Sequence, residues 1–145
     1  MELAKRTVLL VEDHPPEREM IRRTLVTQDF HVETVADYHA AVTYLSQFVP
    51  QLVCLDLTLP RESGFELCEY IRNDARHKFV PVLVMSDWSS PEDMAHAEDV
   101  GANAFLKKPF TREKLLKYVV TLLDGPHASR PSVRRLRRSE YPDRG

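Results

Sequence analysis

Three acidic side chains follow short apolar runs at distant points of the chain, where they could act together. Glu12 and Asp13 directly follow one run, and Asp56 follows another. If the runs are neighbouring strands, the carboxylates converge, and each pair about 4 Å apart repels by about 4 kcal/mol at an effective dielectric near 20. Carboxylate oxygens without histidine or cysteine ligands favour Mg²⁺ as the compensating cation. The sequence therefore predicts a magnesium site at these residues.

A lysine and a hydroxyl group accompany two later apolar runs. Ser86 ends one run, and Lys108 follows the next, immediately before Pro109. The lysine would bring a second positive charge into the acidic pocket. A carboxylate beside Mg²⁺ and an ammonium group suits attack on phosphorus, because an aspartate can form an acyl phosphate while the cations neutralise the transferring oxygens. The set predicts phosphoryl transfer to an aspartate.

Five apolar runs, separated by helix-like segments, must position these side chains. Their hydrophobicity is continuous, as in VLLV and VPVLVM, which is typical of parallel strands buried on both faces. Five successive βα units predict an α/β doubly wound (βα)5 sandwich with a five-stranded parallel sheet, in which ligands bind at the carboxyl ends of the strands. The expected strands are Thr7–Val11, His31–Val35, Leu52–Leu55, Val80–Met85 and Ala104–Leu106.

Each expected helix has a start signal. Pro15 and Pro16 suit a first helical turn. Gly101 suits the end of the fourth helix, and the fifth helix should run to about Leu123. The expected N-cap residues, whose side chains accept a hydrogen bond from the helix backbone, are Asp37, Ser63, Ser90 and Thr111.

The composition indicates one domain with one core, since 145 residues are present and 43% are hydrophobic. No run approaches the roughly 20 apolar residues of a membrane span, and the start MELAKR lacks a signal-peptide pattern, so we expect a cytoplasmic protein. Cys54 and Cys68 suit reduced, buried thiols. The six histidines show no metal-ligand spacing, and we expect them to be surface or capping residues.

The charge changes near the C-terminus. Residues 124–145 hold six arginines against three acidic residues, a net charge of +3, while the rest of the chain carries −5. Almost no apolar residues remain in that segment, so we expect a folded domain over 1–123 and a basic, disordered tail or linker over 124–145. The acidic body argues against nucleic acid as a partner, except for weak contact through the arginine-rich tail.

Taken together, the motifs resemble the receiver domain of two-component response regulators, a bacterial CheY-like family with a flavodoxin-like fold, over about residues 5–123. The resemblance rests on VLLVED, DLTLPRESG, VLVMS, the Gly101-Ala102 pair and FLKKPF, in the family's order. It implies a switch rather than a turnover enzyme. A sensor histidine kinase or histidine phosphotransfer protein would phosphorylate it, and the fourth helix, fifth strand and fifth helix would bind an output protein or a second copy.

The resemblance assigns roles around the phosphate. Asp56 would be the phosphoacceptor, Asp13 a direct Mg²⁺ ligand, and Glu12 a ligand through water. The backbone carbonyl of Thr58 would be a further metal contact. Lys108 would bind a phosphate oxygen, and its bond to the following proline would be cis.

Five residues are implied to act in switching or in setting rates. Ser86 would bind a phosphoryl oxygen, and Phe105 matches the aromatic switch that turns inward as the hydroxyl moves. Thr58 and Trp88 stand where relatives tune phosphate hydrolysis, and a tryptophan that screens water predicts a long-lived phosphate. Asp87 stands where relatives usually have a small residue, so it either slows phosphorylation or points to solvent.

Two other functions remain as alternatives. A pseudo-receiver would keep the fold as a constitutive protein-interaction module, with phosphate control removed by Asp87 or other changes. A haloacid-dehalogenase-like phosphatase would need a second aspartate two residues after the first, where this chain has Thr58. The complete set of site residues favours the phosphorylatable receiver.

Overall fold

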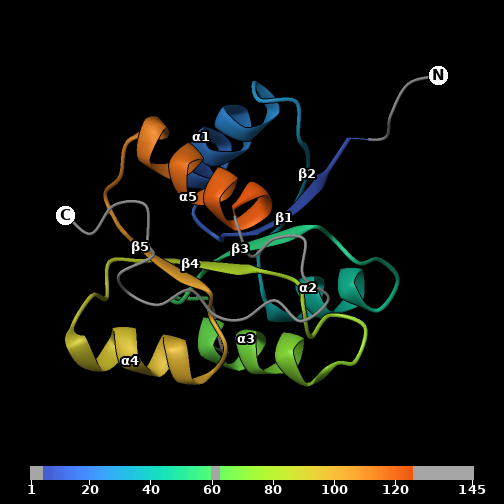
Figure 1. The fold of residues 1–145 in the computed structure, drawn as a ribbon, viewed down its shortest axis with the longest axis vertical. Coiled ribbons are helices and arrows are strands. Elements are labelled where there is room, and N and C mark those ends of the chain that lie inside the picture. The colour runs from blue at the N-terminus through green and yellow to red at the C-terminus, as the bar shows by residue number, and fades with distance from the viewer. Residues whose placement is uncertain (1–4, 60–62, 126–145) are drawn as a thin grey trace.

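A computed structural model describes residues 5–59 and 63–125, which form a parallel sheet between two layers of helices (Figure 1). The strands are β1 (Thr7–Val11), β2 (His31–Val35), β3 (Leu52–Asp56), β4 (Val82–Ser86) and β5 (Ala104–Lys107). The helices are α1 (Pro15–Val26), α2 (Tyr38–Leu45), α3 (Gly64–Asn73), α4 (Pro91–Asp99) and α5 (Arg112–Asp124). The strand order is β2-β1-β3-β4-β5, with every pair parallel. The predicted doubly wound fold is confirmed.

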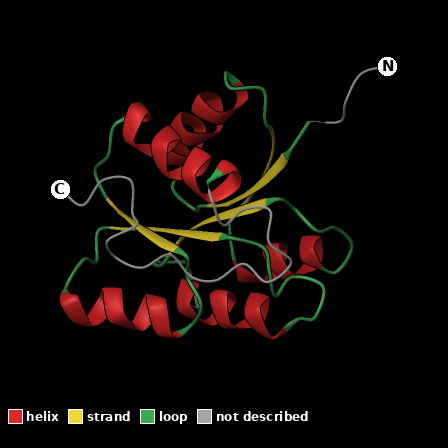
Figure 2. Cartoon of the chain, in the orientation of Figure 1, coloured by secondary structure: helices red, strands yellow, loops and turns green. Residues whose placement is uncertain are grey.

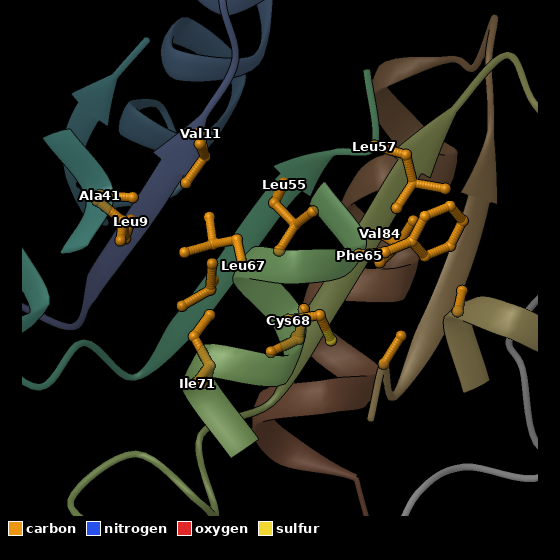
Figure 3. Close-up of a cluster of buried hydrophobic side chains, with 14 of the residues drawn as sticks. Leu9, Val11, Ala41, Leu55, Leu57, Phe65, Leu67, Cys68, Ile71 and Val84 are labelled. Carbon is orange, nitrogen blue, oxygen red and sulfur yellow. The ribbon is translucent and has the colours of Figure 1, made fainter. Parts of the chain in front are cut away.

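The sheet is buried on both faces, which explains its continuous hydrophobicity. Helices α1 and α5 cover one face, and α2, α3 and α4 cover the other (Figures 1 and 2). Alternate residues of each central strand face opposite layers: Val53 and Leu55 join the cluster under α2 to α4, while Leu52 and Cys54 join the cluster under α1 and α5. Figure 3 shows the first cluster, where Leu67 of α3 lies beside the strands.

The helix starts agree with the predicted caps. The side chains of Asp37, Ser63, Ser90 and Thr111 each accept a hydrogen bond from a backbone amide in the first turn of the helix that follows. The two prolines stand in the first turn of α1. Strand β4 begins two residues later than predicted, at Val82, because Pro81 has no amide to donate to the ladder.

One histidine contradicts the expectation of surface or capping positions. His77 is fully buried. Its Nε2 lies 3.1 Å from the carbonyl oxygen of Phe48, 29 residues away in the chain, and its Nδ1 lies 3.2 Å from Oδ2 of Asp74. A carbonyl from a distant loop and a nearby carboxylate therefore surround the ring, and spacing along the chain could not reveal this pocket. Both cysteines are buried, as expected.

The predicted tail lies outside the described residues from position 126 onward. Its first residue, Asp124, belongs to α5 and pairs with Arg6, whose Nη1 lies 2.6 Å from Oδ1 of the aspartate. Among the described residues, no helix is both long and apolar enough to span a membrane.

Candidate functional site

The predicted site residues come together at the carboxyl edge of the sheet. Glu12 and Asp13 follow β1, Asp56 ends β3, Ser86 ends β4, and Lys108 follows β5. Strand order reverses around β1 and β3, and in doubly wound sheets this reversal opens a crevice for ligands. The fold thus places the acidic residues at the position where such proteins bind small charged groups.

Three carboxylates form a compact cluster. Glu12, Asp13 and Asp56 each offer an oxygen, and these oxygens lie within 4.8 Å of one another. Oε2 of Glu12 is buried and has no hydrogen-bond partner among the described residues. An all-oxygen donor set with one buried, unpartnered oxygen fits a hard divalent cation such as Mg²⁺.

The Asp56 carboxylate is held from both sides. Its Oδ1 accepts hydrogen bonds from the backbone amide and the hydroxyl of Thr58, both at 2.9 Å. Its Oδ2 accepts one from Nζ of Lys108 at 3.1 Å. The sequence assigned Thr58 only a carbonyl contact and a rate-tuning position. Its hydroxyl contact could have been anticipated, because short polar side chains two residues apart often close such a turn.

The Lys108 ammonium contacts three carboxylates. Besides Asp56, it donates to Oε1 of Glu12 at 2.8 Å and to Glu17 of α1. The lysine side chain is only 8% exposed, and its bond to Pro109 is cis, as expected. Sequence reasoning missed Glu17, because no feature of the sequence shows that the first turn of α1 lies against the loop after β5.

The surroundings give the buried groups different charges. Burial and the neighbouring Asp56 carboxylate raise the pKa of Glu12 to about 8. Burial would also raise the pKa of Asp56, but its interactions with Glu12, the Thr58 amide and Lys108 outweigh burial and lower that pKa. For Lys108, burial would lower the pKa, but the Glu12 and Glu17 carboxylates raise it. Asp56 is therefore held as the anion that a nucleophile must be.

The remaining predicted residues occupy two environments. Ser86 is fully buried, and its Oγ accepts a hydrogen bond from the Trp88 amide at 2.8 Å. Phe105 is buried in the core cluster under α2 to α4, away from solvent. The side chains of Asp87 and Trp88 are exposed, so neither belongs to the carboxylate cluster.

The response regulator receiver domain family matches residues 8–120 of this chain. The phosphate regulon transcriptional regulatory protein PhoB of Escherichia coli is 29% identical over 118 residues, which cover 81% of this chain and 52% of PhoB. The chain thus spans about half the length of the curated relatives that it matches.

Solved structures show the same fold. The chemotaxis response regulator CheY4 of Vibrio cholerae has a TM-score of 0.79 and 32% identity, covering 83% of this chain and all of CheY4. The receiver domain of the Pseudomonas aeruginosa sensor histidine kinase PA1611, solved with magnesium in its active-site cleft, has a TM-score of 0.75 and 27% identity, covering 81% of this chain and 96% of that domain. This chain therefore belongs to the response regulator receiver domain family of two-component systems.

Proposed function

We propose that this chain is a phosphorylatable receiver whose Asp56 accepts a phosphoryl group from a sensor histidine kinase or a histidine phosphotransfer protein. The main support for this proposal is the buried Asp56 carboxylate, which accepts hydrogen bonds from Thr58 on one oxygen and from Lys108 on the other and lies beside two further acidic residues. This arrangement supports attack on phosphorus more than a merely structural ion pair, which would not need the extra, mutually repelling carboxylates.

Different residues of the site have different roles in the phosphoryl transfer. Glu12, Asp13, Asp56 and the Thr58 carbonyl would hold Mg²⁺, which supplies positive charge to the transferring oxygens. An Asp56 oxygen forms the new bond to phosphorus while the donor's bond from phosphorus to nitrogen breaks, and its electron pair returns to that nitrogen. Lys108 then donates a hydrogen bond to a phosphoryl oxygen, in place of its bond to one of the carboxylates that surround it.

The response to phosphorylation passes through the end of β4. Ser86 exchanges its hydrogen bond from the Trp88 amide for one to a phosphoryl oxygen. Phe105 lies on the neighbouring strand β5, and its ring is already buried before this exchange. The protein is a switch in this account, because the phosphate shifts the population of conformations rather than turning over a separate substrate.

The output surface proposed from this switch is the face of α4, β5 and α5, which carries charges of opposite sign. Helix α4 carries Glu92, Asp93, Glu98 and Asp99, and the first half of α5 carries Arg112, Lys114 and Lys117 against Glu113. Two copies related by a twofold axis could bring an acidic helix against a basic one, and an output protein could use the same complementarity.

The phosphohistidine donor would be made from ATP, so the proposed activity belongs in the cytoplasm.

The first experiment measures intact mass after incubation with acetyl phosphate and Mg²⁺, with Trp88 fluorescence as a second readout. We expect a phosphoryl mass on the wild type and on Asp29→Asn, whose exposed carboxylate lies outside the site. Asp56→Asn should acquire none. A folded wild type that stays unmodified would contradict the proposal, and phosphorylation appearing only in Asp87→Ala would establish the pseudo-receiver alternative.

A further inference from the structure

Glu17 contacts the site lysine from α1 and lies outside the carboxylate cluster that fits a metal. We propose that Glu17 is a positioning residue that competes with the phosphoryl group for the Lys108 ammonium and so weakens phosphoryl binding at Asp56. This inference rests on the proposed phosphorylation of Asp56. It adds to the site a residue that limits how readily the switch is turned on.

The number of donors on the ammonium supports this competition. A lysine side chain offers three N–H donors, and the three carboxylates of Glu12, Asp56 and Glu17 each accept from Nζ. A phosphoryl oxygen can therefore gain a bond from Lys108 only if one carboxylate gives way. Without Glu17, one donor becomes available while two anchors still keep the ammonium beside Asp56.

Glu17 differs from the other two partners in its relation to the metal. Glu12 and Asp56 belong to the carboxylate cluster, so a bound cation would share their negative charge. Glu17 does not belong to that cluster, so a bound cation would not share its charge, which faces Lys108 and, at 3.6 Å, Nδ1 of the exposed His14. Its side chain is 38% exposed, so water screens the interaction and the expected effect is moderate.

A cavity beside the ion pair provides a way to restore the carboxylate. Glu17, Asp87 and Lys108 line its polar side, and the cavity measures about 160 Å³. Met20 and Phe110 are among the apolar residues that line it. Shortening Glu17 to alanine extends this space toward the ammonium, where a free formate ion can take the place of the lost carboxylate.

The test is a titration with beryllofluoride, a phosphoryl mimic, in the presence of Mg²⁺, followed by Trp88 fluorescence. Glu17→Gln keeps an acceptor but removes the charge, and we expect it to bind the mimic roughly fivefold more tightly than the wild type, the size of a partly exposed ion pair. The matched control is Glu19→Gln. Glu19 lies on the same helix but pairs with Arg22 and Arg23, so its loss should leave the titration unchanged.

Glu17→Ala tests whether the effect comes from the carboxylate itself. We expect tighter binding of the mimic in this variant and a return toward the wild-type affinity when sodium formate is added. Sodium chloride at the same ionic strength should not reverse the gain. A merely structural role for Glu17 would predict lower thermal stability and no response to formate.

The outcomes separate this inference from the proposed function. A wild type that binds the mimic, together with Glu17→Gln of equal or weaker affinity, overturns the role of Glu17 and leaves the proposed function intact. Glu17→Ala that binds more tightly but ignores formate also overturns it. A wild type that does not bind the mimic overturns the proposed function and this inference with it.

Discussion

Glu12 and Asp56 lie side by side at the ends of neighbouring strands, yet their surroundings shift their pKa values in opposite directions. Asp56 has hydrogen bonds on both oxygens, from Thr58 and Lys108, which stabilise its charged form. Glu12 is fully buried and has one unpartnered oxygen, so burial favours its neutral form. At this scale, individual hydrogen bonds decide which carboxylate carries the charge.

The raised pKa of Glu12 predicts a pH-dependent stability of the metal-free protein. Its folded-state pKa of about 8 exceeds its ordinary 4.5, so the stability linked to this group is intact below pH 4.5 and lost as pH rises through about 8. As the pH rises from about 5 to about 9, the free energy of unfolding of Glu12→Gln should increase relative to that of the wild type by on the order of 2 kcal/mol. Urea unfolding in EDTA measures this gain.

Saturating Mg²⁺ provides the control for Glu12. A cation that binds the cluster stabilises the charged carboxylate, so the advantage of Glu12→Gln at high pH should shrink or reverse when Mg²⁺ is present. An equal difference between the two proteins at all pH values would show that Glu12 does not titrate as described.

Trp88 is expected to slow hydrolysis of the phosphate. Its amide donates to Ser86 Oγ, and its ring is 47% exposed beside the site, where it can restrict the approach of water. Trp88→Ala should lose its phosphate several-fold faster in a time course of phosphoprotein mass after donor removal. Phe79→Ala, which removes another exposed ring far from the site, is the control. Equal rates for wild type and Trp88→Ala would remove the screening role.

At the scale of elements, the turn between α4 and β5 joins three parts of the fold. Gly101 adopts a φ of 107°, which side-chain-bearing residues rarely adopt. Nε of Arg72, on α3, donates to the Gly101 carbonyl at 2.9 Å, and Asn103 accepts from both Arg72 and the Val82 amide. The turn therefore links α3, α4 and the strands, and it helps to set the position of the proposed output face.

Gly101→Ala tests the importance of this turn. A Cβ at Gly101 would lie 2.2 Å from Cγ of Arg72, and the positive φ adds backbone strain. We expect a loss of about 1–3 kcal/mol in the free energy of unfolding, measured with urea. In an Arg72→Ala background the clash disappears, so the same substitution should cost less. An equal cost in both backgrounds would show that backbone strain alone is responsible.

At the scale of the whole molecule, one sheet separates two hydrophobic clusters, and α1 and α5 cover the same face of the sheet. The ends of the described domain meet there, since Arg6 precedes β1 and pairs with Asp124 at the end of α5. The two ends of the described domain are therefore linked.

Removal of residues 126–145 tests the proposed domain boundary. A chain ending at Gly125 keeps both clusters and the Arg6–Asp124 pair, so we expect an unchanged urea midpoint and unchanged phosphorylation by acetyl phosphate. A shorter chain ending at Leu122 loses that ion pair and the end of α5, and it should be less stable. A large loss of stability in the chain that ends at Gly125 would show that the domain extends into the tail.

The sequence by itself determined the features that depend on neighbouring residues. Continuous apolar runs predicted the parallel strands, and the caps at Asp37, Ser63, Ser90 and Thr111 marked the helix starts, because strand burial and capping follow local chemistry. The order of these elements also placed Glu12, Asp13, Asp56 and Lys108 at one edge of the sheet, because parallel strands all end on the same side.

Only the tertiary structure decided which of these groups are in contact and which of them are charged. Glu17 reaches Lys108 across 91 positions of the chain, and His77 lies in a pocket that includes the Phe48 carbonyl. The high pKa of Glu12 likewise depends on burial by several elements at once. Such contacts arise from how α1, the loops and the strands pack in three dimensions, and long-range packing leaves no fixed spacing in the sequence.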